Sequence, residues 1–151
     1  MKLLCDRMLG TLSKWLRVYG IDTFYPDEEL NDSDLIKISK KENRVLITRD
    51  KELIYDAKKE LVDTIFIKSK ILDEQLKEVS KNVKIGKTKV LTRCLLCNSI
   101  LEKINKNEVK NKIPDKVFEF FNDFYYCPKC DKIYWKGSHY EKMIEKIEKR
   151  L

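Results

Sequence analysis

Short apolar runs alternate with helical patterns over the first eighty residues of the chain. Four of these runs have the length and composition of buried strands, and residues with helical spacing separate each from the next. The predicted strands cover residues 2–5, 21–25, 44–48 and 62–67. Strands that alternate with helices over short connections are typical of a parallel sheet with right-handed crossovers. The pattern therefore predicts an α/β fold.

The helices between these strands are indicated by apolar residues three and four positions apart. The first is marked by Met8, Leu12, Trp15, Leu16 and Tyr19. Gly20 ends this helix, and the next begins near Asn31 or Asp32. Two more are predicted over 51–60 and 71–79. The apolar face that carries Trp15 and Tyr19 fits a place in the core, and it fits a homodimer interface equally well.

The pattern changes at residues 80–89, which are rich in Lys and Asn and contain one Gly. We place a boundary here between an α/β domain over 1–85 and a second module over 90–151. In the second module the sequence predicts strands over 124–126 and 132–135 and a final helix with one apolar face. That face consists of Tyr140, Met143, Ile144, Ile147 and Leu151.

Four of the five cysteines form two CxxC pairs, Cys94 with Cys97 and Cys127 with Cys130. Each pair can form a tight knuckle that directs both thiolates at one ion, and two knuckles complete the tetrahedron that zinc prefers. Because four thiolates leave no open position, this zinc would be structural. Redox-active CxxC pairs are the alternative. Cys5 ends a predicted strand and is interpreted as a small buried hydrophobe.

Composition and charge limit the classes of protein that fit. The chain is 42% hydrophobic, which is enough for a real core, and no apolar run approaches the ~20 residues of a membrane span. We therefore expect a soluble, cytoplasmic protein that does not enter a membrane. The net charge of +7 fits a polyanionic partner such as nucleic acid, and it fits a solvated charged surface equally well.

Acidic residues follow three of the predicted strands. Asp6 directly follows the first, Asp32 and Asp34 come after the second, and Asp50 follows the third. In an open parallel sheet, ligands bind beyond the carboxyl ends of the strands, so these acids can meet at one edge. Clustered carboxylates repel one another unless a hard cation such as magnesium or manganese lies between them. The alternatives are helix caps at Asp32 and Asp50, or structural ion pairs with neighbouring arginines.

Motifs along nearly the whole chain resemble the Mut-seven C-terminal RNase family, which is similar to the PIN nucleases and carries a zinc ribbon. The matching segments are DRMLG at 6–10, LSKWLR at 12–17, DSDL at 32–35, LITRD at 46–50, RCLLCN at 93–98, CPKC at 127–130 and YWKGSH at 134–139. This resemblance implies a PIN-like, three-layer α/β domain followed by a small zinc ribbon. It also implies metal-dependent hydrolysis of RNA phosphodiester bonds.

The resemblance also implies roles for individual residues. Asp6, Asp32 and Asp50 match the acidic positions that would hold magnesium or manganese, and Asp34 could substitute for Asp32. No residue after Ile67 clearly supplies the fourth acid found in many PIN nucleases.

Several residues are candidates for contacts with RNA, which we expect to be single-stranded. These are Arg49, Lys136 and His139, while Tyr134 and Trp135 could stack on bases or pack the ribbon against the sheet. The alternative to a ribonuclease is a non-catalytic RNA- or protein-binding module that retains the nuclease fold.

Overall fold

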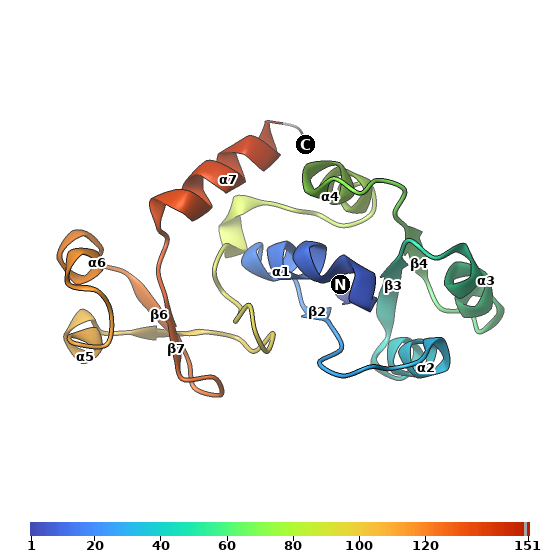
Figure 1. The fold of residues 1–151 in the computed structure, drawn as a ribbon, viewed down its shortest axis with the longest axis horizontal. Helices are drawn as coiled ribbons and strands as arrows, with labels where there is room; N and C mark the ends of the chain where they lie inside the picture. The colour runs from blue at the N-terminus through green and yellow to red at the C-terminus, as the bar shows by residue number, and fades with distance from the viewer. Residues whose placement is uncertain (150) are drawn as a thin grey trace.

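Four parallel strands form the central sheet of the protein. The structure is a computed structural model that describes residues 1–149 and 151. The strands are β1 (Lys2–Cys5), β2 (Thr23–Phe24), β3 (Arg44–Thr48) and β4 (Thr64–Phe66), in the order β2-β1-β3-β4 (Figure 1). The predicted parallel α/β fold is confirmed, and the two strands at the sheet edges are shorter than predicted.

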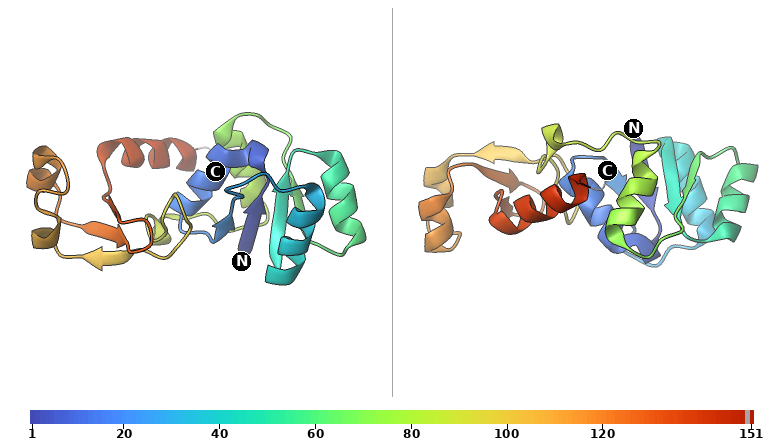
Figure 2. Two further views of the ribbon diagram at one scale, coloured as in Figure 1. Left: turned by 60° about the horizontal axis from the view of Figure 1, so that its bottom comes forward. Right: turned by 90° about the horizontal axis from the view of Figure 1, so that it is seen from above.

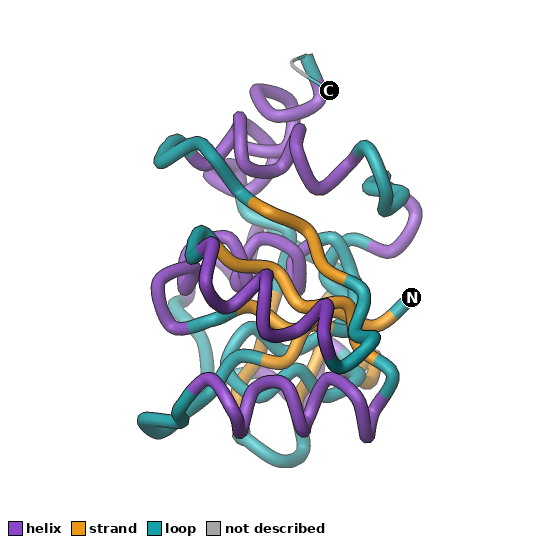
Figure 3. Tube along the Cα trace, turned by 90° about the vertical axis from the view of Figure 1, so that its right-hand side faces the viewer, coloured by secondary structure: helices purple, strands orange, loops and turns teal. Residues whose placement is uncertain are grey.

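Helices cover both faces of this sheet because neighbouring strand residues point to opposite sides. Helices α1 (Gly10–Val18) and α4 (Leu72–Ser80) pack in one core with Leu3 and Cys5 of β1. Helices α2 (Asp32–Glu42) and α3 (Lys51–Lys59) pack on the other face, where Leu4 and Leu46 lie. Figure 3 shows the strands between these two layers of helices.

The chain between β1 and α1 differs from the prediction. A short 3-10 helix, η1 (Arg7–Leu9), precedes α1, and the Asp6 side chain caps it by accepting a hydrogen bond from the Met8 amide. Met8 is 67% exposed and contributes nothing to the predicted apolar face. Trp15 and Tyr19 are buried within the chain itself. The homodimer stays a prediction, and this face is part of the core.

The C-terminal module is a three-stranded antiparallel ribbon with strand order β5-β6-β7. Its strands are β5 (Glu102–Ile104), β6 (Phe124–Cys127) and β7 (Lys132–Tyr134). The sequence pattern predicted β6 and β7 but missed β5. It also missed the two short helices that follow β5, α5 (Lys106–Val109) and α6 (Asp115–Phe120). These segments are short and largely exposed, so they show no hydrophobic period.

Helix α7 (Ser138–Glu148) runs from the ribbon back towards α1 and α4 (Figure 2). Its residues Ile144 and Ile147 are buried in the same core as the α1 side chains. The rings of Trp15 and Tyr140 lie 6.1 Å apart, which ties α7 directly to α1. The ribbon and the sheet therefore share one hydrophobic core, while the division at residues 85–90 into separately folding domains stays a prediction.

The segment between the two modules passes tightly over the end of α1. The Leu91 amide donates to the Val18 carbonyl oxygen at 2.8 Å. Gly20 has a φ of +78°, and a Cβ at this position would lie 2.3 Å from the Lys89 carbonyl oxygen. Only glycine accommodates both the left-handed backbone and this close approach. No helix within residues 1–149 combines the length and apolar character needed to cross a membrane.

We predict that Gly20→Ala lowers the free energy of unfolding by roughly 1–3 kcal/mol, because the added methyl group meets backbone that cannot move away freely. Urea denaturation measures this change. Gly86→Ala is the matched control, since a Cβ there meets no atom within 4 Å. Equal stability of the two variants would show that the linker is not held against α1 as described.

Candidate functional site

The four cysteines of the two CxxC pairs come together at one end of the ribbon. The Sγ atoms of Cys94, Cys97, Cys127 and Cys130 all lie within 4.8 Å of one another. The Cys97 and Cys127 sulfur atoms are 3.5 Å apart, close to the ~3.8 Å expected for tetrahedral Zn–S bonds of about 2.3 Å. The site can therefore bind zinc through four sulfur ligands, as predicted.

The two knuckles have the same local backbone. The residue after the second cysteine of each pair, Asn98 or Asp131, has a left-handed conformation, with φ of 70° and 52°. The amide of each of these residues donates to the carbonyl oxygen of the first cysteine of its pair, at 2.9 Å in the first knuckle and 2.8 Å in the second. Asn and Asp tolerate this conformation better than other side chains with a Cβ. The turn directs both thiols of each pair to one point.

Polar groups surround the sulfur atoms. The Tyr134 hydroxyl lies 3.2 Å from the Cys94 sulfur and accepts a hydrogen bond from the Leu95 amide. Burial disfavours the Cys97 thiolate, but hydrogen bonds with Ser99, Cys127 and Cys130 together outweigh it and lower the pKa of Cys97 to about 6. Such contacts orient metal ligands and favour the thiolate form. Because Tyr134 is buried against this site, the suggestion that it stacks on a base is wrong.

The first knuckle covers the outer edge of β2. The Asn98 side chain accepts a hydrogen bond from the Thr23 amide at 3.0 Å and donates to the Asp22 carboxylate at 2.7 Å. Buried Arg17 donates to the carbonyl oxygens of Thr23 at 2.9 Å and Leu95 at 2.8 Å. These bonds satisfy backbone groups that an edge strand otherwise exposes. The metal site therefore also supports the sheet.

We predict that Cys97→Ser abolishes stoichiometric zinc binding and also lowers the melting temperature of the whole chain by roughly 10 °C, a loss of a few kcal/mol. The reason is that loss of the knuckle also removes the cover of β2. Metal analysis and circular dichroism measure the two effects.

The control for this variant is Cys5→Ala, since Cys5 is fully buried in the sheet core and away from the cluster. It should retain about one zinc ion per chain. Unchanged zinc content in Cys97→Ser would contradict the four-sulfur site.

A second candidate site lies at the carboxyl edge of the parallel sheet. The register pairs Cys5 with Ile47, so Asp6 after β1 lies beside Thr48 at the end of β3. Asp6 is only 6% exposed. Its carboxylate accepts hydrogen bonds from the Thr48 hydroxyl and from the Met8 amide. These two bonds fix the orientation of the Asp6 side chain.

The other acids of this edge stand at the starts of helices. Asp50 caps α3, and one of its carboxylate oxygens accepts from the Glu52 and Leu53 amides. Asp32 is the first residue of α2, but the cap of that helix is a reciprocal pair formed by Asn31 and Asp34. Asp50 therefore caps its helix, as one alternative suggested. Asp32 does not, because Asn31 and Asp34 cap α2 instead.

Electrostatic interactions connect Asp6, Asp32 and Asp50. Burial raises the pKa of Asp6 most, hydrogen bonds with Thr48 and Met8 oppose this, and the Asp50 and Asp32 charges raise the pKa further. Burial also raises the pKa of Asp32, followed by the charges of Asp50 and Asp56. Within the described residues, the cysteines are the only group of three or more potential ligands with closely gathered donor atoms. The carboxylates lie within electrostatic range of one another without forming so compact a group.

The predicted RNA contacts lie in two places. Arg49 lies between Thr48 and Asp50 at the acidic edge, and its buried Nε has no hydrogen-bond partner among the described residues. No ion pair joins Arg7 or Arg49 to an acid in the part of the chain described. Lys136 and His139 are exposed at the beginning of α7. Their contacts with RNA stay predictions.

Sequence reasoning missed the residues that support both sites. Thr48 orients Asp6, while Asn98 and Arg17 attach the knuckle to the sheet. A polar residue after the second cysteine of a CxxC pair could have indicated Asn98. The role of Arg17 had no such signal, because it depends on contacts with residues far away in the chain.

The family model described as the Mut7-C RNAse domain matches residues 1–147. The chain therefore belongs to the Mut7-C RNAse domain family. Comparisons with curated proteins and with solved structures give no match. Family membership indicates a nuclease-like role with RNA as the substrate.

We predict that Asp6→Asn stabilises the zinc-bound protein, without magnesium or manganese, at pH 7–8 by about 1 kcal/mol, since it removes a buried charge and keeps one oxygen that accepts from the Met8 amide. Folding raises the pKa of Asp6, so wild-type stability from this group is complete below the ordinary aspartate pKa and is lost as pH rises through the raised value. The difference between the two proteins should therefore vanish in acid. Urea denaturation across pH measures it.

Exposed Asp63 provides the comparison, and Asp63→Asn should change stability little at either pH. A destabilised Asp6→Asn variant at neutral pH would contradict the charge repulsion described here.

Proposed function

We propose that this protein is a ribonuclease that hydrolyses RNA phosphodiester bonds at the acidic sheet edge with a magnesium or manganese ion. The observation that carries the proposal is that Asp6 is buried at a sheet edge where Asp32 and Asp50 add like charge, in a chain that belongs to an RNase family. Charge that the fold concentrates without neutralising it is typical of functional sites. The ribbon, held by zinc, would help to bind the RNA.

The carboxylate oxygens at this edge fit a hard divalent cation, which prefers oxygen ligands and offsets their charge. Asp6, Asp32 and Asp50 would hold it, and Asp34 is the substitute for Asp32, although its carboxylate also caps α2. Such an ion supplies an activated water and stabilises charge on the phosphate.

The protein's own residues prepare the edge for RNA. The hydrogen bonds of Thr48 and Met8 hold Asp6 in one orientation, and the cap of α3 holds Asp50. Arg49 lies between Thr48 and Asp50 at this edge, and a guanidinium beside the acids can donate to a phosphate oxygen. A positive group here would compensate the repulsion between the RNA backbone and the carboxylates.

A non-catalytic RNA- or protein-binding module is the second candidate, and one observation favours it. Asp6 and Asp50 both cap helices, so the fold has a use for these acids without any ion. The same experiment separates the two functions.

We predict that Asp6→Asn and Asp50→Asn each lower the rate of manganese-dependent RNA cleavage by about 100-fold or more. Asparagine keeps the cap at both positions and removes the negative charge that would bind the ion. Cleavage of a fluorescently labelled single-stranded RNA, with and without a chelator of divalent ions, measures the effect.

The matched control is Asp63→Asn, an exposed aspartate outside this edge, which should retain wild-type activity. Equal cleavage by all of these proteins would reveal a contaminant. RNA binding without any cleavage, in protein of full zinc content, would support the binding module instead.

A further inference from the structure

The outer face of the ribbon contains a cavity of about 560 Å³, which is separate from the acidic edge. Its apolar wall is formed by Ile113, Pro114, Ile133 and Trp135, and Lys112 and Lys132 also line it. The lining includes one acid, Asp131, whose carboxylate accepts a hydrogen bond from the Tyr126 hydroxyl at 2.7 Å. The cavity thus combines an aromatic ring with a net positive rim.

Strand geometry explains why Trp135 is available here while Tyr134 is not. Neighbouring residues along a strand face opposite sides. Tyr134 therefore faces the cysteine cluster, and Ile133 and Trp135 both line the cavity on the other side. Trp135 is half-buried, and its ring meets the Phe124 ring edge-on at 6.4 Å between centroids. This contact holds the indole in place.

A second cavity of about 290 Å³ lies between α1 and the first knuckle. Its lining includes Gly10, Lys14, Tyr25, Leu96, Lys132 and Tyr140. Tyr25 donates through its hydroxyl to the Arg7 carbonyl oxygen at 2.8 Å, directly beside the Asp6 cap. The cavity therefore begins near the acidic edge.

Lys132 lines both cavities, and its ammonium group lies 5.4 Å from the Tyr134 ring, on the side of β7 opposite Ile133 and Trp135. Lys14 lines the second cavity, Lys112 lines the Trp135 cavity and Lys132 lines both, so positive charges occur along the two cavities. Leu96 and Tyr140 add apolar and aromatic surface between these lysines. Alternating cationic and aromatic side chains are the chemistry that binds single-stranded nucleic acid, with phosphates on lysines and bases on rings.

We propose that single-stranded RNA runs from the acidic edge through the second cavity, between α1 and the first knuckle, to the ribbon. There one unstacked base inserts against Trp135. The inference rests on the proposed ribonuclease function and adds to it the site that holds the substrate beyond the cleavage point. A single strand is required because a base within a duplex cannot present its face to the indole. Lys132 contacts the phosphate between the two cavities.

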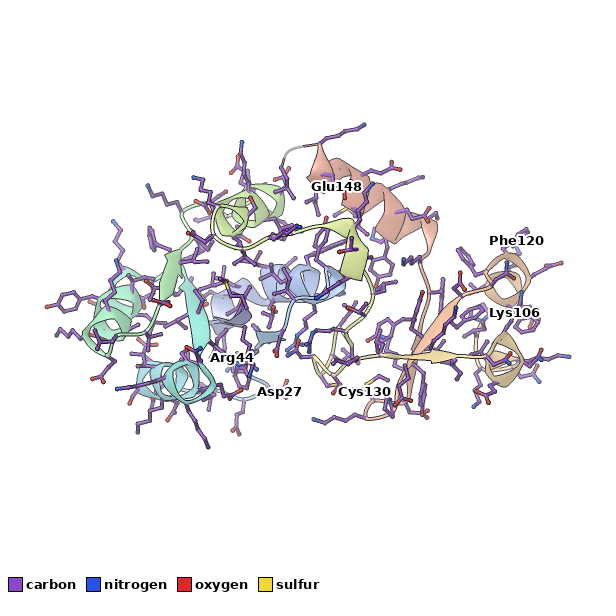
Figure 4. The ribbon with its side chains drawn as sticks, turned by 180° about the vertical axis from the view of Figure 1, so that it is seen from behind. Asp27, Arg44, Lys106, Phe120, Cys130 and Glu148 are labelled. Atoms are coloured by element: carbon purple, nitrogen blue, oxygen red, sulfur yellow. The ribbon has the colours of Figure 1, made fainter. Side chains whose placement is uncertain are left out.

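The test measures binding of a labelled single-stranded RNA in the Asp6→Asn background, where cleavage is slow compared with the binding measurement. Trp135→Ala should weaken binding by about 10-fold, the factor expected for loss of one base–aromatic stack. Trp135→Phe should stay within about 3-fold of the parent because it keeps an aromatic face. Phe120→Ala is the control, since Phe120 is 74% exposed and lies at the end of the ribbon far from the sheet (Figure 4).

Two further measurements separate base recognition from charge. An RNA of abasic residues should bind equally to the parent and to Trp135→Ala. Lys132→Ala should reduce the salt dependence of binding by about one phosphate contact, while Lys116→Ala, which changes a lysine outside both cavities, should not. Zinc content and circular dichroism confirm that each variant is folded.

The inference is overturned if folded Trp135→Ala binds the single-stranded RNA as tightly as the parent does. It is also overturned if Trp135→Ala loses the same affinity for the abasic RNA as for the RNA with bases. Manganese-dependent cleavage by the wild type then still stands as evidence for the proposed nuclease. Absence of cleavage together with Trp135-dependent binding would instead overturn the nuclease and keep the base site.

Discussion

One buried arginine joins the parts of this molecule. Arg17 extends from α1 and donates to Thr23 of the edge strand and to Leu95 of the first knuckle. A buried guanidinium without partners is costly, so the sheet edge and the knuckle must both be in place for it to be satisfied. Asn98 and Asp22 complete the contact from the other side. Folding of the sheet and closure of the cysteine site therefore depend on each other.

Arg17 is satisfied by its hydrogen bonds, whereas the acids at the sheet edge keep charge that lowers the stability of the fold. The parallel register brings Asp6 beside Thr48, and the start of α3 adds Asp50 to the same edge. Caps and hydrogen bonds keep these acids oriented, yet burial and mutual repulsion raise the pKa of Asp6. The fold thus maintains negative charge where it costs stability. In the proposed function, a divalent cation offsets this charge.

The ribbon has two faces with different chemistry. Its inner face holds the cysteines, Tyr134 and Lys132, and its outer face presents Ile133 and Trp135 beside Lys112. The alternation of β7 creates this division, since one residue serves the metal site and its neighbours line the cavity. The cysteine site and the outer cavity can therefore serve different purposes on one short ribbon.

The sequence by itself determined the parallel α/β order, the four-cysteine cluster and the acids after the strands. These follow from local periodicity and fixed spacing, which survive in any compact arrangement of the chain. The sequence did not predict β5, the exposed position of Met8 or the burial of Tyr134. Nor did it indicate that Arg17 and Asn98 would fasten the ribbon to β2. Contacts between residues more than seventy positions apart decide the roles of Arg17 and Asn98, and only tertiary packing establishes which buried polar groups meet.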